Sequence, residues 1–513
     1  MVHWQRRQTM FVRQIRRCLL LVIIASLVVV GSVWSQTFQN IEKQVKECTL
    51  SNGMKFIVLE RHDAPVVSFH TYADVGSVNE TYGITGISHL LEHLAFKGTK
   101  TIGTTDYEAE TVVLARLDSI YAELNREKRK GAAADSTRLA SLQAEFEKTQ
   151  QQASSYVINN DFFDLLSKAG AKDVNAFTSN DATQYVCSLP SNKVEFWMAI
   201  ESDRFLNFVP REFYKERNVV MEERRLSLDT RPAGKLYEEF LAAAFKAHPY
   251  HHTVIGHMSD IQSITRQDVI NYFKKYYIPS NMVVAIVGDV KADEIFKMAK
   301  TYFGRIPSGP KPEPIRTVEP PQPGERRVEV EAKAQPLLYI GYHRPAIYPH
   351  PEDLVFDAIA NVLGSGRTSW LYKRLVKETK VATAVYAFNG FPGYKFPNLF
   401  VIFAVPSKGH TAEDCLVLID EEIEKLKTKP ISPEELNKFK RNFKKDWLEG
   451  MKSNARMAQN LASNEVLMGD WHLLFQMFKD VDKVTAADIQ RVAKQYLVRK
   501  NRTIGQIVTV KGD

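Results

Sequence analysis

Cysteine is scarce in this sequence. Only four cysteines occur among 513 residues, and Cys18 lies near the N-terminus, directly before an apolar stretch. The spacing of the other three, Cys48, Cys187 and Cys415, matches neither a metal ribbon nor a disulfide framework. We therefore interpret them as small core residues, and whether two of them form a disulfide stays open.

A strongly basic surface is also lacking. The formal net charge is +8, but five arginines between positions 6 and 17 contribute five of those charges, which leaves +3 for the remainder. No basic stripe with interleaved aromatic residues follows, and this excludes nucleic acid as a partner. Hydrophobic residues make up 44% and charged residues 25%, as in folded globular proteins. The length predicts roughly two to four domains.

Long apolar runs are absent after residue 34. The one such run, Leu19–Trp34, follows the arginine-rich start and precedes small residues at a cleavage site ending at Ser35. We interpret residues 1–35 as a signal peptide, with an uncleaved N-terminal anchor as the alternative. Either reading predicts an exported chain, in the bacterial periplasm or tethered to the membrane and facing it.

A proline-rich segment divides the remaining chain. Residues 306–325 contain prolines and glycines that forbid a continuous helix or a central strand, which indicates a linker. Residues 42–305 and 326–513 each begin with segments rich in β-branched and aromatic residues, which predict strands. These segments lie at 55–61 and 66–75 in the first region and at 327–331 and 337–342 in the second. A segment that is predicted to be helical then follows in each region, at 85–96 in the first and at 353–363 in the second. The pattern predicts an α+β fold of two similar half-modules.

Residues 105–156 are expected to form an inserted helical hairpin in the first half. Thr105 and Glu108 have the spacing of a capping box, and two apolar stripes at helical spacing flank a turn near Gly131. The many charges indicate a solvated surface. Because the insert offers no ligand, we expect it to be dispensable for metal binding.

The sequence His89-Leu-Leu-Glu92-His93 carries the strongest chemical signal. On a helix, His89 and His93 lie four residues apart and share a face, where two imidazoles can bind one zinc ion. Glu92 is placed beside the metal, where a general base could take a proton from zinc-bound water. The order of residues is that of the inverted zinc-protease motif.

A third ligand is needed, and a later acidic segment offers one. Glu216 and Glu223 are seven residues apart, so on a helix they face the same way, and one could bind metal while the other supports a histidine. By spacing alone Glu222 competes with Glu223. Histidines also gather at 248, 251, 252 and 257, but Pro249 interrupts helical spacing, so we interpret this cluster as a surface loop.

Taken together, the segments His89–His93 and Glu216–Glu223 resemble the insulinase–pitrilysin (inverzincin) zinc metallopeptidases, and bacterial relatives of the mitochondrial processing peptidase in particular. The resemblance implies one Zn²⁺ per chain, bound by His89, His93 and Glu223, with Glu92 as base and Glu216 in support. The interval between His93 and Glu223 is longer than is usual in this family, by about the length of the inserted hairpin.

The same resemblance points to a substrate-binding strand at Asn175, Ala176, Phe177 and Thr178. An exposed edge strand can pair with the backbone of an extended peptide of almost any sequence. An ordinary internal strand is the alternative. The implied activity is a zinc-dependent metalloendopeptidase that cleaves extended or unfolded peptides, and a non-catalytic assembly or binding subunit of the same fold is the alternative function.

The second half departs from the family pattern. It has no His-x-x-Glu-His segment, and Val376 and Thr383 occupy the positions where active relatives carry an arginine and a tyrosine that orient substrate and stabilise the oxyanion. Larger relatives also enclose substrate between four such modules. We therefore expect a heterodimer with a related chain that supplies the Arg/Tyr pair, or otherwise a homodimer in which Tyr372, Arg374 or Tyr386 takes over the role.

Overall fold

The computed structural model describes residues 41–510, and from Glu47 onward these residues form one compact unit. The predicted leader, residues 1–35, lies outside the described residues. Between residues 41 and 510, no helix is both long enough and apolar enough to cross a membrane.

The first half is built on a six-stranded sheet with the order β1-β2-β6-β3-β5-β4. Strand β2 runs parallel to β6, whereas β3 is antiparallel to both β6 and β5, and β4 is antiparallel to β5. Strand β4 lies at the end of the order, so one of its two edges carries no strand of this sheet. The strands are β1 (Val45–Thr49), β2 (Lys55–Glu60), β3 (Val66–Ala73), β4 (Lys172–Thr178), β5 (Thr183–Pro190) and β6 (Met282–Gly288).

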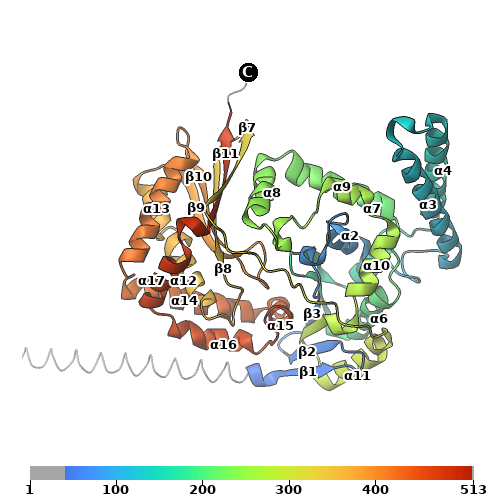
Figure 1. The fold of residues 1–513 in the computed structure, drawn as a ribbon. Helices are drawn as coiled ribbons and strands as arrows, with labels where there is room; N and C mark the ends of the chain where they lie inside the picture. The colour runs from blue at the N-terminus through green and yellow to red at the C-terminus, as the bar shows by residue number, and fades with distance from the viewer. Residues whose placement is uncertain (1–40, 511–513) are drawn as a thin grey trace, which may run out of the picture. The chain divides into compact units, whose positions relative to one another are not determined.

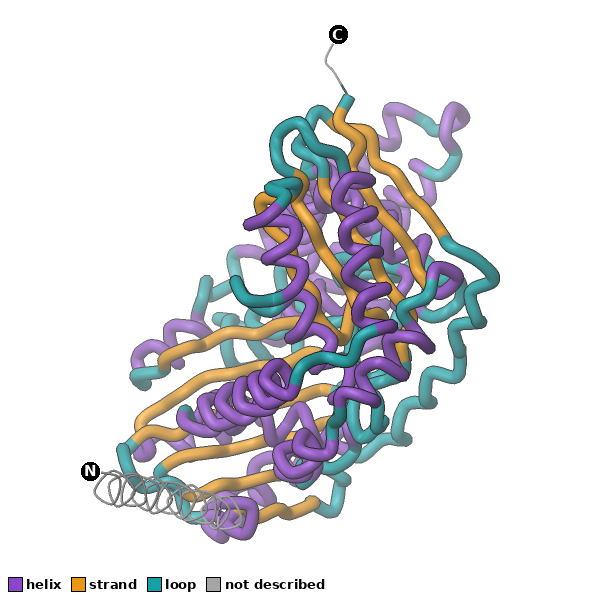
Figure 2. Tube along the Cα trace, turned by 90° about the vertical axis from the view of Figure 1, so that its left-hand side faces the viewer, coloured by secondary structure: helices purple, strands orange, loops and turns teal. Residues whose placement is uncertain are grey.

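The second half repeats this arrangement without the first strand. Its order is β7-β11-β8-β10-β9, with β7 parallel to β11 and the remaining pairs antiparallel. The five strands thus match β2, β6, β3, β5 and β4 in order and direction. Figure 2 shows the strands of the two sheets with helices packed against them. The strands are β7 (Arg326–Ala332), β8 (Leu337–Arg344), β9 (Ala382–Phe391), β10 (Asn398–Pro406) and β11 (Arg502–Thr509).

Two helices pack against the sheet of the half to which they do not belong in sequence. Helix α8 belongs to the first half in sequence but packs on β7 and β11 of the second, and α15 of the second half packs on β3 and β6 of the first. The α-helices of the first half are α2 (Ile87–Leu94), α3 (Tyr107–Lys128), α4 (Ser136–Ser154), α5 (Asp161–Lys168), α6 (Val194–Leu206), α7 (Phe213–Arg224), α8 (Pro232–Ala244), α9 (Met258–Ser263), α10 (Arg266–Tyr276) and α11 (Ala292–Tyr302). Those of the second half are α12 (Asp353–Gly364), α13 (Ala412–Thr428), α14 (Pro433–Lys452), α15 (Asn454–Met468), α16 (Leu473–Asp480) and α17 (Ala486–Tyr496).

The insert forms two helices, α3 and α4, that pack side by side (Figure 1). The predicted capping box at Thr105 is wrong, because Asp106 is the N-cap and its carboxylate accepts a hydrogen bond from the Ala109 amide at 3.1 Å. Aspartate is a stronger N-cap than threonine, and Asp106 immediately precedes the first residue of α3. The predicted α+β fold of two similar half-modules, with an inserted helical hairpin in the first, is confirmed.

The apolar core of the first half includes one face of α2 and part of the hairpin. Leu90, Leu91 and Leu94 are fully buried there, and so in large part are Tyr121 of α3 and Phe146 of α4. The three described cysteines are free thiols, and Cys187 and Cys415 are buried as predicted. No described residue therefore forms a disulfide.

Candidate metal centre

Helix α2 is fixed in the first half by its apolar face and by its N-terminus. Its leucines are buried in the core, whereas His89, Glu92 and His93 lie on the less buried side of the helix. At the N-terminus, the buried carboxylate of Glu80 accepts hydrogen bonds from the Gly86 and Ser88 amides, both at 2.8 Å. These amides have no partner within the helix, so Glu80 satisfies them and holds the start of α2 in place.

Helix α7 brings the later acidic segment to α2. The two helices are in contact, and Glu223 Oε2 lies 3.7 Å from His89 Nε2 and 3.6 Å from His93 Nε2. One ligand atom from each of the three residues lies within 4.8 Å of the others. Tetrahedral zinc with bonds of about 2.0–2.1 Å places neighbouring ligand atoms roughly 3.3 Å apart. The donor set and its spacing therefore fit a zinc ion with a fourth position left for water or substrate.

Glu222 is placed differently from its neighbour. Its carboxylate turns to Arg225, with oxygen–nitrogen distances of 2.6 and 2.8 Å, and its side chain is 51% exposed. It is not part of the group formed by His89, His93 and Glu223. The two glutamates that sequence spacing could not separate thus occupy different sides of α7.

Glu216 lies behind His93. Its Oε2 atom is 3.6 Å from His93 Nδ1, and its Oε1 atom is 2.6 Å from Lys97 Nζ. Burial opposes ionisation of this carboxyl, but the hydrogen bonds with His93 and Lys97 outweigh it and lower the pKa of Glu216. An ionised carboxylate behind the imidazole orients the ring and favours the form in which Nε2 is free to bind metal.

The two histidines have different electrostatic surroundings. Burial, with a smaller contribution from His93, lowers the pKa of His89 to about 4, so that its imidazole is neutral at physiological pH. Burial acts in the same direction on His93, but the neighbouring glutamates raise its pKa overall. The His89 Nδ1 atom is buried without a hydrogen-bond partner among the described residues. A neutral imidazole is the form that can ligate a metal ion.

Glu92 lies beside the metal-binding group and contacts the predicted substrate strand. The Thr178 hydroxyl, at the end of β4, donates a hydrogen bond of 2.6 Å to Glu92 Oε2. Burial raises the pKa of Glu92, and the bond from Thr178 counteracts part of that rise. A carboxylate whose pKa is raised toward neutrality is suited to accept and return a proton.

The four residues predicted for substrate binding belong to edge strand β4. Asn175 and Phe177 are exposed, whereas Ala176 and Thr178 are half-buried, and the strand pairs with β5 on one side. A cleft in front of α2 is lined by Glu92, His93, Asn175 and Ala176, together with aromatic side chains that include Phe96 and Phe163. The strand therefore borders the same cleft as Glu92 and one of the three candidate zinc ligands, His93.

Two residues of this site were not found from the sequence. Lys97 bridges Glu216 and Glu212, at 2.6 and 3.3 Å, and Glu80 caps α2. Lys97 could have been noticed from its position four residues after His93, on the same helical face if the helix were to continue. Glu80 lies in a loop before α2, and no sequence signal marks it.

The histidine cluster near residue 250 is not the surface loop that was predicted. His248 and His252 are each only 2% exposed, and His251 donates or accepts a bond of 2.7 Å with Tyr82. These histidines do not converge on a metal-binding group, since the described residues contain one such group, that of His89, His93 and Glu223. Pro249 begins a short 3-10 turn, Pro249–His251, and this turn packs inward against aromatic residues.

The segment expected to lack the Arg/Tyr pair runs from a short helical stretch, Tyr372–Glu378, into β9. Arg374 forms an ion pair of 2.9 Å with Glu421, so its guanidinium is already engaged. Tyr386 is 55% exposed on β9, the strand that matches β4 in the first half.

Comparison with known proteins is consistent with this geometry. The family model described as insulinase (peptidase family M16) matches residues 56–114, and that described as peptidase M16 inactive domain matches residues 263–443. Zinc protease PqqE of Helicobacter pylori is 28% identical over 456 residues, which cover 87% of this chain and 89% of that protein. A probable mitochondrial-processing peptidase subunit beta of Arabidopsis thaliana is 23% identical over 479 residues, covering 90% and 78%.

A solved structure extends the match to three dimensions. The crystal structure of a protease from Helicobacter pylori superimposes with a TM-score of 0.76 at 26% identity, covering 90% of this chain and 99% of that one. Named zinc proteases thus match the chain over most of its length, which supports a zinc metallopeptidase in general. The chain thus contains two segments that match models of peptidase family M16, and over most of its length it is similar to zinc proteases and to a mitochondrial-processing peptidase subunit.

Proposed function

We propose that the chain is a zinc-dependent metalloendopeptidase that hydrolyses peptide bonds in extended or unfolded peptides. The observation that carries the proposal is the meeting of His89, His93 and Glu223 within 4.8 Å of one another. Glu92 lies on the same helix as the two histidines and lines the same cleft as edge strand β4.

The side chains divide the work of the reaction. His89, His93 and Glu223 would hold the ion, and Glu216 would hold the ring of His93 in its orientation. Bound zinc supplies Lewis-acid chemistry, by which a water molecule and the substrate carbonyl are polarised. Glu92 then accepts a proton from the attacking water and returns it to the leaving amine nitrogen.

Strand β4 explains the proposed preference for extended peptides. A peptide that adds to its free edge would form main-chain hydrogen bonds that do not depend on sequence. Thr178, which ends β4, bonds to Glu92, so a peptide paired with this strand would pass directly in front of the base.

A single substitution tests the base. Glu92→Gln keeps the size of the side chain but cannot accept a proton, so we expect a zinc-loaded variant whose turnover falls by about 10²–10⁴-fold. Glu222→Gln is the matched control, because it removes an exposed carboxylate that lies outside the metal-binding group. Zinc content should be measured on both variants beside hydrolysis of an unfolded peptide, with and without chelator.

The alternative is a non-catalytic assembly or binding subunit of the same fold. The match of residues 263–443 to a model described as an inactive domain favours it, as does the loss of the Arg/Tyr pair. A zinc-loaded wild-type chain that hydrolyses no peptide, alone or with a related chain, would support this second function. Hydrolysis that disappears in Glu92→Gln would exclude it.

We further propose that the chain is exported to the periplasm and works as a heterodimer with a related chain. Val219 and Leu226 flank Glu223 on the chain and are 45% and 49% exposed, which is consistent with contact to substrate or a partner. Arg374 already forms an ion pair with Glu421, which supports a partner chain as the source of the missing arginine. Light scattering and peptide assays on the isolated chain test this, and full activity of a homogeneous monomer or homodimer would contradict it.

A further inference from the structure

The inserted hairpin packs against the helix that carries Glu216 and Glu223. Tyr214 of α7 contacts Tyr121 of α3 and Phe146 of α4, with ring centroids 4.5 and 5.1 Å apart. The Arg217 guanidinium lies 4.8 Å from the centroid of the Tyr121 ring. At about 100° per residue, positions 214 and 217 lie on the side of α7 roughly opposite to 216 and 223. The hairpin therefore covers the rear of the helix that brings Glu223 to the histidines.

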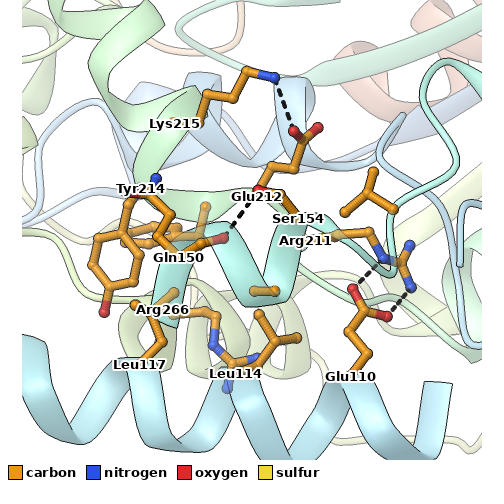
Figure 3. A pocket seen from close by; sticks show the side chains of 13 residues that line it. Glu110, Leu114, Leu117, Gln150, Ser154, Arg211, Glu212, Tyr214, Lys215 and Arg266 are labelled. Carbon is orange, nitrogen blue, oxygen red and sulfur yellow. Dashed lines mark hydrogen bonds and ion pairs between the residues drawn. The ribbon is translucent and has the colours of Figure 1, made fainter. Parts of the chain in front are cut away.

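A fully buried ion pair joins the hairpin to the start of α7 (Figure 3). Glu110 of α3 accepts hydrogen bonds from Arg211 Nε at 2.6 Å and from Nη2 at 2.8 Å. The two side chains are 0% and 1% exposed. Arg211 immediately precedes Glu212 and α7, so this bidentate pair holds the entry to α7 against α3.

The same guanidinium also binds the segment that follows α2. Arg211 donates to the carbonyl oxygens of Lys97, Thr99 and Ile102 at 2.9, 2.9 and 3.1 Å. One buried arginine thus connects three parts of the chain: the hairpin, the continuation of the histidine helix and the start of the glutamate helix. Without Glu110, its charge would be buried with no carboxylate partner.

From this arginine a short series of contacts reaches the metal-binding group. Lys97, whose carbonyl is held by Arg211, contacts Glu216 through its ammonium group at 2.6 Å. Glu216 lies 3.6 Å from Nδ1 of His93. A change in the position of Arg211 would therefore shift both the lysine and the carboxylate that orient this histidine.

We propose that the hairpin is a structural part of the metal centre, and that Glu110 is a positioning residue that acts through Arg211 on Lys97, Glu216 and His93. The inference rests on the proposed zinc-binding role of His89, His93 and Glu223. It runs against the sequence-based expectation that residues 105–156 are dispensable, because their removal would uncover Tyr214 and Arg217 and leave Arg211 unpaired.

The experiment compares zinc binding in the full chain and in three variants. Glu110→Gln leaves the shape but removes the charge that pairs with Arg211. The double variant Glu110→Leu with Arg211→Met removes both charges, and so provides a folded protein if the single variant does not fold. The control is Glu145→Gln, which breaks an exposed pair of 2.9 Å with Arg116 that joins α3 to α4 and includes no residue of α7.

Two measurements separate positioning from general destabilisation. Competition with a chelator gives the zinc dissociation constant, and the visible spectrum of the Co²⁺-loaded protein reports coordination geometry. Circular dichroism confirms that each variant is folded. We expect zinc affinity to fall by about 10–100-fold in Glu110→Gln and in the double variant, with a changed cobalt spectrum, and to stay unchanged in Glu145→Gln.

The proposal is overturned if the folded Glu110→Gln chain, or the folded double variant, keeps wild-type zinc affinity and the wild-type cobalt spectrum. A wild-type chain that binds zinc but cleaves no peptide contradicts the proposed activity and leaves this inference standing. A wild-type chain that binds no zinc contradicts both.

Discussion

Zinc affinity should separate the three glutamates of α7 in a defined order. Glu223 lies 3.6–3.7 Å from both histidine nitrogens, Glu216 contacts His93 from behind, and Glu222 is paired with Arg225 at the surface. Changing each in turn to glutamine keeps side-chain size and removes only the charge. The expected loss of zinc affinity is therefore largest for Glu223, intermediate for Glu216 and absent for Glu222.

The sizes follow from what each carboxylate touches. A residue that orients a metal ligand typically contributes about 10–100-fold in affinity, which corresponds to about 1.4–2.8 kcal/mol. We expect Glu216→Gln to fall within that range. Glu223→Gln removes one of three protein ligands, so its loss should exceed about 100-fold. Glu222→Gln should change the dissociation constant by less than about twofold, because exposed ion pairs contribute little.

The assay is chelator competition on the purified, folded variants at one pH and one ionic strength. Glu222→Gln serves as the matched control, since it removes the same charge from the same helix. Equal zinc retention by Glu223→Gln and Glu222→Gln would refute the assigned ligand. A greater loss from Glu222→Gln would show that α7 presents a different face to the histidines in solution.

Three further outcomes can be measured independently. Thr178→Val removes a hydrogen bond that lowers the pKa of Glu92, so the acidic limb of the kcat/KM profile should move to higher pH; an unmoved limb would count against Glu92 as the base. Asp181→Asn should cost about 1–3 kcal/mol of unfolding free energy, because the buried carboxylate accepts bonds from Tyr250 and from two amides of the second half; an unchanged denaturant midpoint would disprove this. Burial alone would raise the pKa of Glu238, but hydrogen bonds from two basic side chains lower it from 4.5 to about 2. Its stabilisation is thus present above pH 4.5 and lost as the pH falls toward 2, so the stability gap to Glu238→Gln, about 1–2 kcal/mol after allowance for solvent screening, should close over that window; a gap independent of pH would contradict the sign.

Local patterns were enough to predict several helices and strands and the two histidines that are candidate ligands. The spacing of His89 and His93 requires only helical periodicity, and the expected strands at 55–61, 66–75 and 337–342 coincide closely with β2, β3 and β8. Both depend on neighbours within a few residues, which a single sequence displays directly. The match of strand order between the two halves, by contrast, was expected only in outline.

Contacts between distant segments could not be read in the same way. The sequence left Glu222 and Glu223 equivalent by spacing, and family resemblance was needed to favour one of them. The structure places only Glu223 near both histidines, because the rotation of α7 is set by Tyr214 and Val220, which are buried in the core. Helix orientation depends on packing against partners far along the chain, and these partners are not visible in local periodicity.

The sequence by itself determined several strands and helices, the division into two α+β halves and the histidine pair, because each follows from short-range pattern and composition. Only the tertiary structure decided that His248 and His252 are buried, that Glu80 caps α2, and that the charged hairpin encloses Glu110 beside Arg211. A charge in a helical insert is usually solvated, and only the approach of a distant arginine makes its burial favourable.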